Sequence, residues 1–129
     1  MKKTILVADD NEEILEVIQI VLEDEGYTVQ TSLDGACFRH MQGNLPNLIL
    51  LDVLLSGEDG REICQQLKKD SRTRNIPVIL ISAHSKASEA AQMSGADEFL
   101  RKPFDLDVLV DLVKRYTSSC LAEKLVQRV

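Results

Sequence analysis

Carboxylates, a hydroxyl and an ammonium each stand at the end of a short apolar run in this sequence. The residues concerned are Asp9, Asp10, Asp52, Ser82 and Lys102. Three carboxylates brought close together would repel one another and raise the pKa of at least one of them, unless a cation neutralised their charge. Mg²⁺ suits such a set, because it takes oxygen ligands and keeps several of its waters.

A metal ion, an ammonium and a hydroxyl around one carboxylate would match the needs of phosphoryl transfer, in which charge on the equatorial oxygens has to be neutralised. Asp52 would then be the nucleophile and would form an aspartyl phosphate. Taken singly, each residue has an ordinary explanation, such as a solvated helix start, a loop carboxylate, a strand-end hydroxyl or a surface lysine. Their occurrence at separate strand ends of one repeating pattern favours the joint interpretation.

Five short strands, each followed by a helical pattern, would position these side chains. They are predicted at Thr4–Ala8, Tyr27–Thr31, Asn47–Asp52, Pro77–Ser82 and Glu98–Leu100. Continuous apolar runs such as the third and fourth are typical of strands buried on both faces. The alternation predicts an α/β fold, a five-stranded parallel sheet with helices on both faces. In the order 2-1-3-4-5 the first and third strands are neighbours at the switch point, where ligands bind, so the carboxylates would converge.

Helices are predicted at 12–25, 34–42, 60–69 and 85–93, with a last helix that starts at 106. Asn11, Asp59 and Asp105 are candidate N-cap residues. Helix 85–93 is rich in Ala and Ser, so we expect it to be mobile. Apolar periodicity predicts the inward faces of the first and last helices, formed by Ile14, Val17, Ile18, Val21 and Leu22 and by Leu106, Leu109, Val113 and Tyr116.

The length of 129 residues predicts one domain, and 44% hydrophobic with 28% charged residues is ordinary for a protein with a real core. A net charge of −6 argues against direct nucleic-acid binding. No apolar run approaches the roughly 20 residues that span a bilayer, and none near the start is long enough for a signal peptide, which predicts a cytoplasmic protein away from the membrane. Three widely spaced cysteines indicate free thiols rather than a metal or redox site; they are Cys37, Cys64 and Cys120.

The motifs around the polar residues resemble the receiver domain of two-component response regulators, the CheY-like superfamily. They are Asp9-Asp10, LLDVLLSGEDG around Asp52, ILISA around Ser82 and FLRKPF around Lys102. The resemblance covers about residues 3–118, so we expect a receiver domain at 1–118 and a C-terminal helical extension or tail at 119–129. It implies that Asp52 is the phosphoacceptor and that the donor is a histidine kinase or a histidine phosphotransfer protein.

The resemblance also implies how Mg²⁺ is held. Asp10 and Asp52 would bind the ion directly, and the backbone carbonyl of Leu54 would be a third protein ligand. Asp9 would act mainly through water. The only enzymatic steps implied are phosphorylation of the protein's own aspartate and its autodephosphorylation.

A two-state switch is implied by the same match. Ser82 and Lys102 would contact the phosphoryl oxygens, and Phe99 would fill the space that Ser82 leaves as it moves. Helix 85–93 and the strand after it would then shift. The face formed by the fourth helix, the fifth strand and the fifth helix is the expected surface for a downstream target protein, and a homodimer is left open. Lys102-Pro103 matches a cis peptide of the family.

Four positions depart from the family pattern. Ser56 stands where Pro is frequent, so we expect a looser loop after the acceptor. Leu54 and His84 occupy the two positions that usually tune dephosphorylation. The switch aromatic, Phe99, is Phe rather than Tyr and lacks a hydroxyl.

Two other functions stay open from the residues alone. A Mg²⁺-dependent phosphohydrolase with an aspartate nucleophile usually carries it on the first strand, in an Asp-x-Asp arrangement under a cap. Here the first strand ends in Asp9-Asp10-Asn11, and no segment is long enough for a cap. A receiver-like module that binds partners without phosphate is the other alternative, and absence of Mg²⁺ binding would support it.

Overall fold

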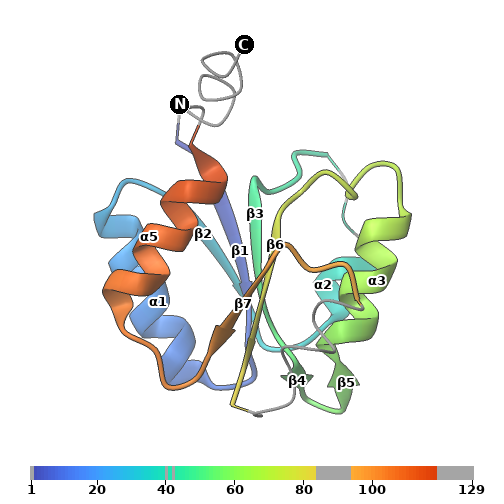
Figure 1. Ribbon diagram of the computed structural model, residues 1–129, viewed down its shortest axis with the longest axis horizontal. Coiled ribbons are helices and arrows are strands. Elements are labelled where there is room, and N and C mark those ends of the chain that lie inside the picture. The colour runs from blue at the N-terminus through green and yellow to red at the C-terminus, as the bar shows by residue number, and fades with distance from the viewer. Residues whose placement is uncertain (1, 40, 42, 84–93, 119–129) are drawn as a thin grey trace.

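A parallel five-stranded sheet forms the centre of the protein, with helices on both faces (Figure 1). The computed structural model describes residues 2–39, 41, 43–83 and 94–118. The order across the sheet is β2-β1-β3-β6-β7, which confirms the predicted 2-1-3-4-5 arrangement. The strands are β1 (Thr4–Ala8), β2 (Thr28–Ser32), β3 (Leu48–Asp52), β6 (Val78–Ser82) and β7 (Glu98–Arg101).

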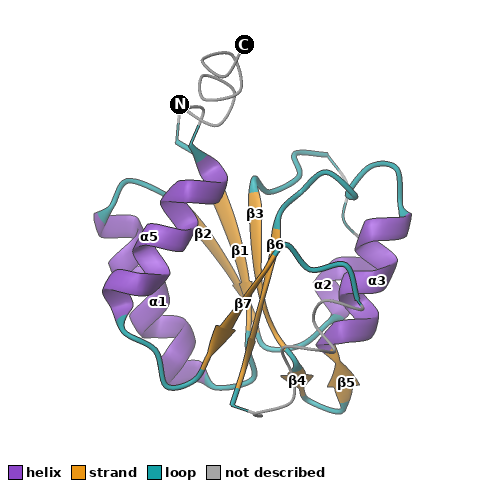
Figure 2. Ribbon diagram, in the orientation of Figure 1, coloured by secondary structure: helices purple, strands orange, loops and turns teal. Residues whose placement is uncertain are grey.

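In the described part of the chain, helices lie on both faces of this sheet (Figure 2). On one face lie α1 (Glu12–Asp24) and α5 (Leu106–Thr117), and on the other α2 (Ala36–Arg39) and α3 (Gly60–Lys69). The helix predicted at 85–93 lies outside the described residues, as do His84, Cys120 and the extension at 119–129. None of the helices in the described part of the chain has the length and apolar character needed to cross a membrane.

The core consists of two layers because successive strand residues point to opposite faces. β3 shows this plainly, since all five of its residues are buried. Leu48 and Leu50 pack with α1 and α5, whereas Ile49 and Leu51 pack on the side of α3. The continuous apolar run predicted as a doubly buried strand is therefore confirmed.

Helix α1 begins where the sequence predicts. The side chain of Asn11 accepts hydrogen bonds from the backbone N–H groups of Glu13 and Ile14. The inward face is partly different from the prediction: Leu15, Ile18 and Leu22 are buried, and Val17 is exposed. Ile14 and Val21 of the predicted face are partly buried against the same core, so the prediction differs from the structure at Val17 and Leu15.

Helix α5 also differs from its prediction in two details. Leu106 is exposed rather than inward, and the buried residues are Leu109, Val110, Leu112, Val113 and Thr117. Asp105 precedes the helix with extended backbone but makes no side-chain capping bond.

Two further segments near the carboxyl edge of the sheet depart from the prediction. Helix α2 starts at Ala36 rather than Asp34, and the Asp34 carboxylate accepts the Ala36 N–H. The segment after Asp52, expected to be a loop, contains a two-stranded antiparallel ladder of β4 (Leu54–Leu55) and β5 (Glu58–Asp59). Gly57 forms its turn with a φ of 83°.

Candidate functional site

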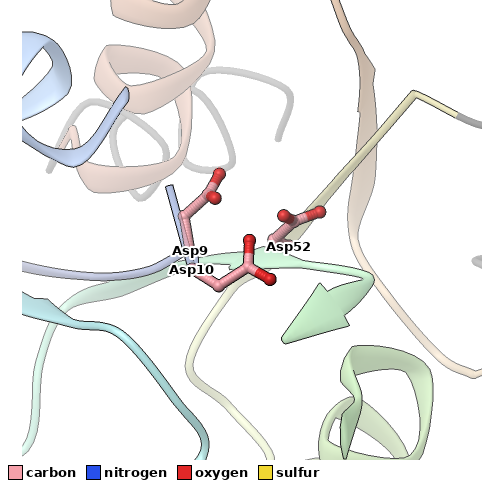
Figure 3. Close-up of side chains that lie close together, drawn as sticks. All are labelled: Asp9, Asp10 and Asp52. Atoms are coloured by element: carbon pink, nitrogen blue, oxygen red, sulfur yellow. The ribbon is translucent and has the colours of Figure 1, made fainter. Parts of the chain in front are cut away.

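Three carboxylates meet at the carboxyl edge of the two central strands. β1 and β3 are parallel neighbours, so Asp9 and Asp10 after β1 come close to Asp52 at the end of β3. One oxygen from each of the three lies within 4.8 Å of the others. Asp9 and Asp52 are buried, whereas Asp10 is exposed. Figure 3 shows the three side chains gathered at this edge.

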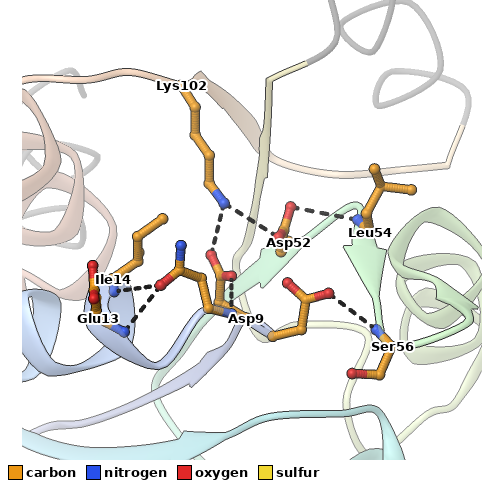
Figure 4. Close-up of polar contacts among 9 residues, drawn as sticks. Asp9, Glu13, Ile14, Asp52, Leu54, Ser56 and Lys102 are labelled. Carbon is orange, nitrogen blue, oxygen red and sulfur yellow. Dashed lines mark hydrogen bonds and ion pairs between the residues drawn. The ribbon is translucent and has the colours of Figure 1, made fainter.

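Lys102 brings a positive charge to this group from the segment after β7. Its Nζ lies 2.9 Å from Oδ2 of Asp9 and 3.2 Å from Oδ2 of Asp52 (Figure 4). Its backbone N–H donates to the carbonyl oxygen of Ser82 at 2.9 Å, which ties the segment to the end of β6. The peptide between Lys102 and Pro103 is cis, as the sequence predicts. The sequence placed the lysine beside Asp52 but missed its closer contact with Asp9.

Charge and burial shift the titration of this cluster. Burial, followed by the negative charge of Asp9, raises the pKa of Asp52 to about 6, although Lys102 opposes the shift. Burial acts to lower the pKa of Lys102, but its hydrogen bond to Asp9 and the two neighbouring carboxylate charges outweigh burial and raise that pKa. At neutral pH the cluster therefore holds an ionised Asp52 beside a protonated Lys102.

Backbone N–H groups complete the surroundings of the carboxylates. Asn11 donates to Oδ1 of Asp9 at 2.9 Å. Longer contacts of 3.4 Å join the N–H of Leu54 to Oδ1 of Asp52 and the N–H of Ser56 to Oδ2 of Asp10. The last contact needs a residue other than Pro at position 56, because Pro has no N–H to donate.

The remaining predicted residues lie around this cluster. Ser82 is buried at the end of β6, one residue beyond Ile81, which pairs with Asp52. Leu54 lies in β4 with its side chain exposed. Phe99 is half-buried in β7 and packs against the core layer on the side of α3. The described residues thus bring Asp9, Asp10, Asp52 and Lys102 into direct proximity, with Ser82 on the adjacent strand.

Gly60 is a positioning residue that the sequence reasoning missed. It begins α3, and its N–H donates to the carbonyl oxygen of Val53 at 2.7 Å. A Cβ at this position would collide with the backbone carbonyl of Asp52 and would lie 3.0 Å from the Cα of Val53. The absence of a side chain lets α3 start directly against the strand end that carries Asp52. A glycine at the predicted first residue of a helix is the one signal of this close approach in the sequence.

The sheet order and the acidic pocket with its lysine define a receiver domain of the CheY-like class. The sequence model of the response regulator receiver domain matches residues 5–114. The chain belongs to this family and is a receiver domain of two-component signal transduction.

Curated relatives support this assignment over most of the chain. The DNA-binding dual master transcriptional regulator RpaA of Synechocystis is 39% identical over 113 residues, which cover 85% of this chain and 47% of RpaA. The response regulator PleD of Caulobacter vibrioides is 41% identical over 120 residues, which cover 91% of this chain and 26% of PleD. The chain thus spans about half or a quarter of the length of these relatives.

Solved structures show the same fold. A putative response regulator from Chloroflexus aurantiacus superposes with a TM-score of 0.81 at 30% identity, covering 92% of this chain and 99% of that one. The receiver domain of a signal transduction histidine kinase from Syntrophus aciditrophicus gives a TM-score of 0.83 at 33% identity, with 90% of both chains covered.

Proposed function

We propose that Asp52 is the phosphoacceptor and that it receives its phosphoryl group from a histidine kinase or a histidine phosphotransfer protein. The observation that carries this proposal is the position of the Asp52 carboxylate. It lies 3.2 Å from the Lys102 ammonium, within a group of three carboxylates. With a pKa of about 6, the carboxylate is ionised and nucleophilic at neutral pH. An Asp52 oxygen attacks phosphorus while the bond from phosphorus to the donor's nitrogen breaks, and that nitrogen keeps the electron pair.

Lys102 and Ser82 are proposed to bind the transferred group. The phosphoryl group carries close to two negative charges at neutral pH, and the Lys102 ammonium already lies within hydrogen-bond distance of the attacking carboxylate. Ser82 ends the adjacent strand and can add a hydroxyl donor. As these two side chains turn toward the phosphoryl oxygens, Phe99 takes the space beside Ser82. The face predicted to consist of the fourth helix, β7 and α5 then changes for a downstream target protein.

The acidic group also fits Mg²⁺. Its donors are hard oxygens from Asp9, Asp10 and Asp52 within 4.8 Å of one another, which is the chemistry that this ion selects. We assign Asp10, Asp52 and the carbonyl oxygen of Leu54 as direct ligands, and Asp9 as a residue that acts through water. When bound, the ion would neutralise part of the negative charge on the phosphoryl oxygens.

The domain is assigned to residues 1–118, with residues 119–129 as an extension, and the protein to the cytoplasm. Its chemistry is limited to phosphorylation of its own aspartate and loss of that phosphate. The match covers 47% of RpaA and 26% of PleD, so the functions of these whole proteins are not assigned to this chain.

Phosphorylation by acetyl phosphate with Mg²⁺, followed by intact mass spectrometry, tests the acceptor. The expected result is one phosphoryl group on the chain, none on Asp52→Asn, and one on the control Asp107→Asn, whose side chain is exposed on α5. Uptake by Asp52→Asn would show that the acceptor is another residue. Continuous release of phosphate from an ester would support a phosphohydrolase instead.

A further inference from the structure

The short hairpin of β4 and β5 brings two backbone N–H groups to the acidic cluster (Figure 4). The N–H of Leu54 contacts the Asp52 carboxylate at 3.4 Å, and the N–H of Ser56 contacts that of Asp10 at 3.4 Å. The ladder of this hairpin has only two residue pairs. Because an isolated two-stranded hairpin is at best marginally stable in water, its position beside the cluster depends on contacts with other segments.

Glu58 makes such a contact close to the tip of the hairpin. Its Oε2 accepts the backbone N–H of Gly35 at 2.9 Å, which joins β5 to the turn before α2. Ser56 makes a longer link to the same turn, since its hydroxyl lies 3.4 Å from the carbonyl oxygen of Leu33. A carboxylate also accepts a stronger hydrogen bond than a neutral group does. The bond to Glu58 is therefore the stronger of these two links.

Gly35 makes room for this contact. A Cβ at position 35 would lie 2.5 Å from Oε2 of Glu58 and 2.8 Å from Cδ1 of Ile63 on α3. A side chain at this position would therefore push the Glu58 carboxylate away from the N–H that it accepts. The close fit between β5 and the turn before α2 thus depends on both partners of the bond.

The register of the ladder connects Glu58 to the proposed metal site. Glu58 pairs with Leu55, the residue that follows Leu54 in β4. Leu55 is buried in the core layer on the side of α3, so packing fixes this residue. The side chain of Leu54 is 56% exposed, so packing does not fix the Leu54 peptide to the same extent. That peptide carries the carbonyl oxygen assigned above as a ligand.

We propose that Glu58 is a positioning residue for Mg²⁺, which holds the carbonyl oxygen of Leu54 in place through its bond to Gly35. This inference rests on the proposed function, in which that oxygen is a direct ligand. Mg²⁺ demands near-ideal octahedral geometry, so a ligand on a displaced hairpin would bind it less well. Glu58 acts through the hairpin and is not itself a ligand.

Negative charge is the other way in which Glu58 could affect the metal. Glu58 and Asp10 line one hollow of about 360 Å³ beside the hairpin. Positioning requires an acceptor oxygen at residue 58, whereas an effect of charge requires an ionised group there. Glu58→Gln keeps the acceptor and removes the charge, so this variant separates the two.

Calorimetric titration of the full chain with MgCl₂ measures the effect. Glu58→Ala removes the acceptor, so the Kd for Mg²⁺ should rise about three- to tenfold. Gly35→Ala should raise it in the same way, whereas Glu58→Gln should stay within about twofold of the parent, because a neutral acceptor bonds more weakly. Glu62→Ala is the matched control. It removes an exposed carboxylate of α3 and should leave the Kd unchanged.

The order of the hairpin is a second readout, measured without metal. The heteronuclear ¹H–¹⁵N NOE of the amides of residues 54–58 reports motion on the picosecond to nanosecond timescale. It should fall in Glu58→Ala and in Gly35→Ala, and it should keep the parent value in Glu58→Gln. The amides of β1 and β3 serve as the internal control.

The outcomes separate this inference from the proposed function. An unchanged Kd in Glu58→Ala would overturn the positioning role and leave the assignment of Asp52 as phosphoacceptor intact. Equal changes of Kd in Glu58→Ala and Glu58→Gln would assign the effect to charge and would also overturn it. Failure of the parent chain itself to bind Mg²⁺ would overturn the proposed metal site together with this inference.

Discussion

The ammonium of Lys102 lies nearer to Asp9 than to the proposed acceptor, at 2.9 Å from Oδ2 of a carboxylate that is 1% exposed. The ammonium of Lys102 therefore interacts with two carboxylates, that of Asp9 after β1 and that of Asp52 at the end of β3. Asp9 also adds a negative charge that works against ionisation of Asp52. This one residue accounts for part of the raised pKa and for the orientation of the lysine.

Asp9→Asn should lower the pKa of Asp52 from about 6, because it removes the neighbouring charge and leaves Lys102 to Asp52 alone. Carboxyl NMR titration in metal-free buffer measures the shift. Asp10→Asn is the matched control, since the charge of Asp10 is not among the causes of the raised pKa, and it should change the midpoint less. An unchanged midpoint in Asp9→Asn would mean that burial alone sets this pKa.

The pH dependence of stability follows from the same group. The usual carboxyl pKa of 3.8 in the unfolded chain lies below the value of about 6 in the folded chain. Between these values the folded state binds more protons than the unfolded state, so this group makes stability fall as pH rises from about 4 to about 6.

Asp52→Asn should remove the decrease in stability between about pH 4 and about pH 6, because the amide does not ionise. In metal-free buffer above pH 6, the variant should exceed the parent protein in free energy of unfolding by about 1 to 3 kcal/mol. At pH 4 the difference should be small. Urea unfolding at both pH values measures it, and a gain of equal size at both would contradict the assignment to ionisation.

The backbone N–H of Ser56 should weaken Mg²⁺ binding, because it donates to Oδ2 of Asp10 when the ion is absent. Ser56→Pro removes that donor, so we expect affinity for Mg²⁺ to rise by about two- to fivefold, which corresponds to roughly 0.5–1 kcal/mol. Calorimetry measures the affinity. Ser56→Ala keeps the N–H and loses only the hydroxyl bond to the carbonyl of Leu33, so its affinity should match that of the parent.

The two helices on one face of the sheet should respond differently to loss of their first polar residue. Asn11→Ala removes a side chain that accepts two backbone N–H groups and should cost about 1 kcal/mol of unfolding free energy. Asp105→Ala removes a side chain with no capping bond and should cost less than about 0.5 kcal/mol. Thermal or urea unfolding compares them, and equal losses would contradict the capping role of Asn11.

Some features could be predicted from local pattern and others depend on distant contacts. The run before Asp52 predicted a doubly buried strand because only such a strand needs continuous apolar residues. The prediction of the inward face of α1 was partly wrong. Leu15 and Val17 are both apolar, and only packing against the sheet determines which of them is buried.

The contacts of Asp10 and Lys102 could not be predicted from the sequence for a different reason. The bond from Ser56 to Asp10 joins backbone to side chain across 46 positions, and any residue other than Pro could make it. The second partner of Lys102, Asp9, is set by how far the segment after β7 reaches over β1. Neither the contact between Ser56 and Asp10 nor that between Lys102 and Asp9 can be predicted from residue type or spacing.

The hydrogen bond between the hydroxyls of Tyr27 and Thr117 holds the end of α5 beside the start of β2. Thr28 pairs with Thr4, so the start of β1 and the end of α5 meet at the pole of the molecule opposite the acidic cluster. A five-residue strand separates the two poles by about 16 Å. A second domain attached at either position would be joined at the pole opposite the acidic cluster, about one strand length from Asp52. A movement of the sheet or of α5 would therefore change the position of that attachment point.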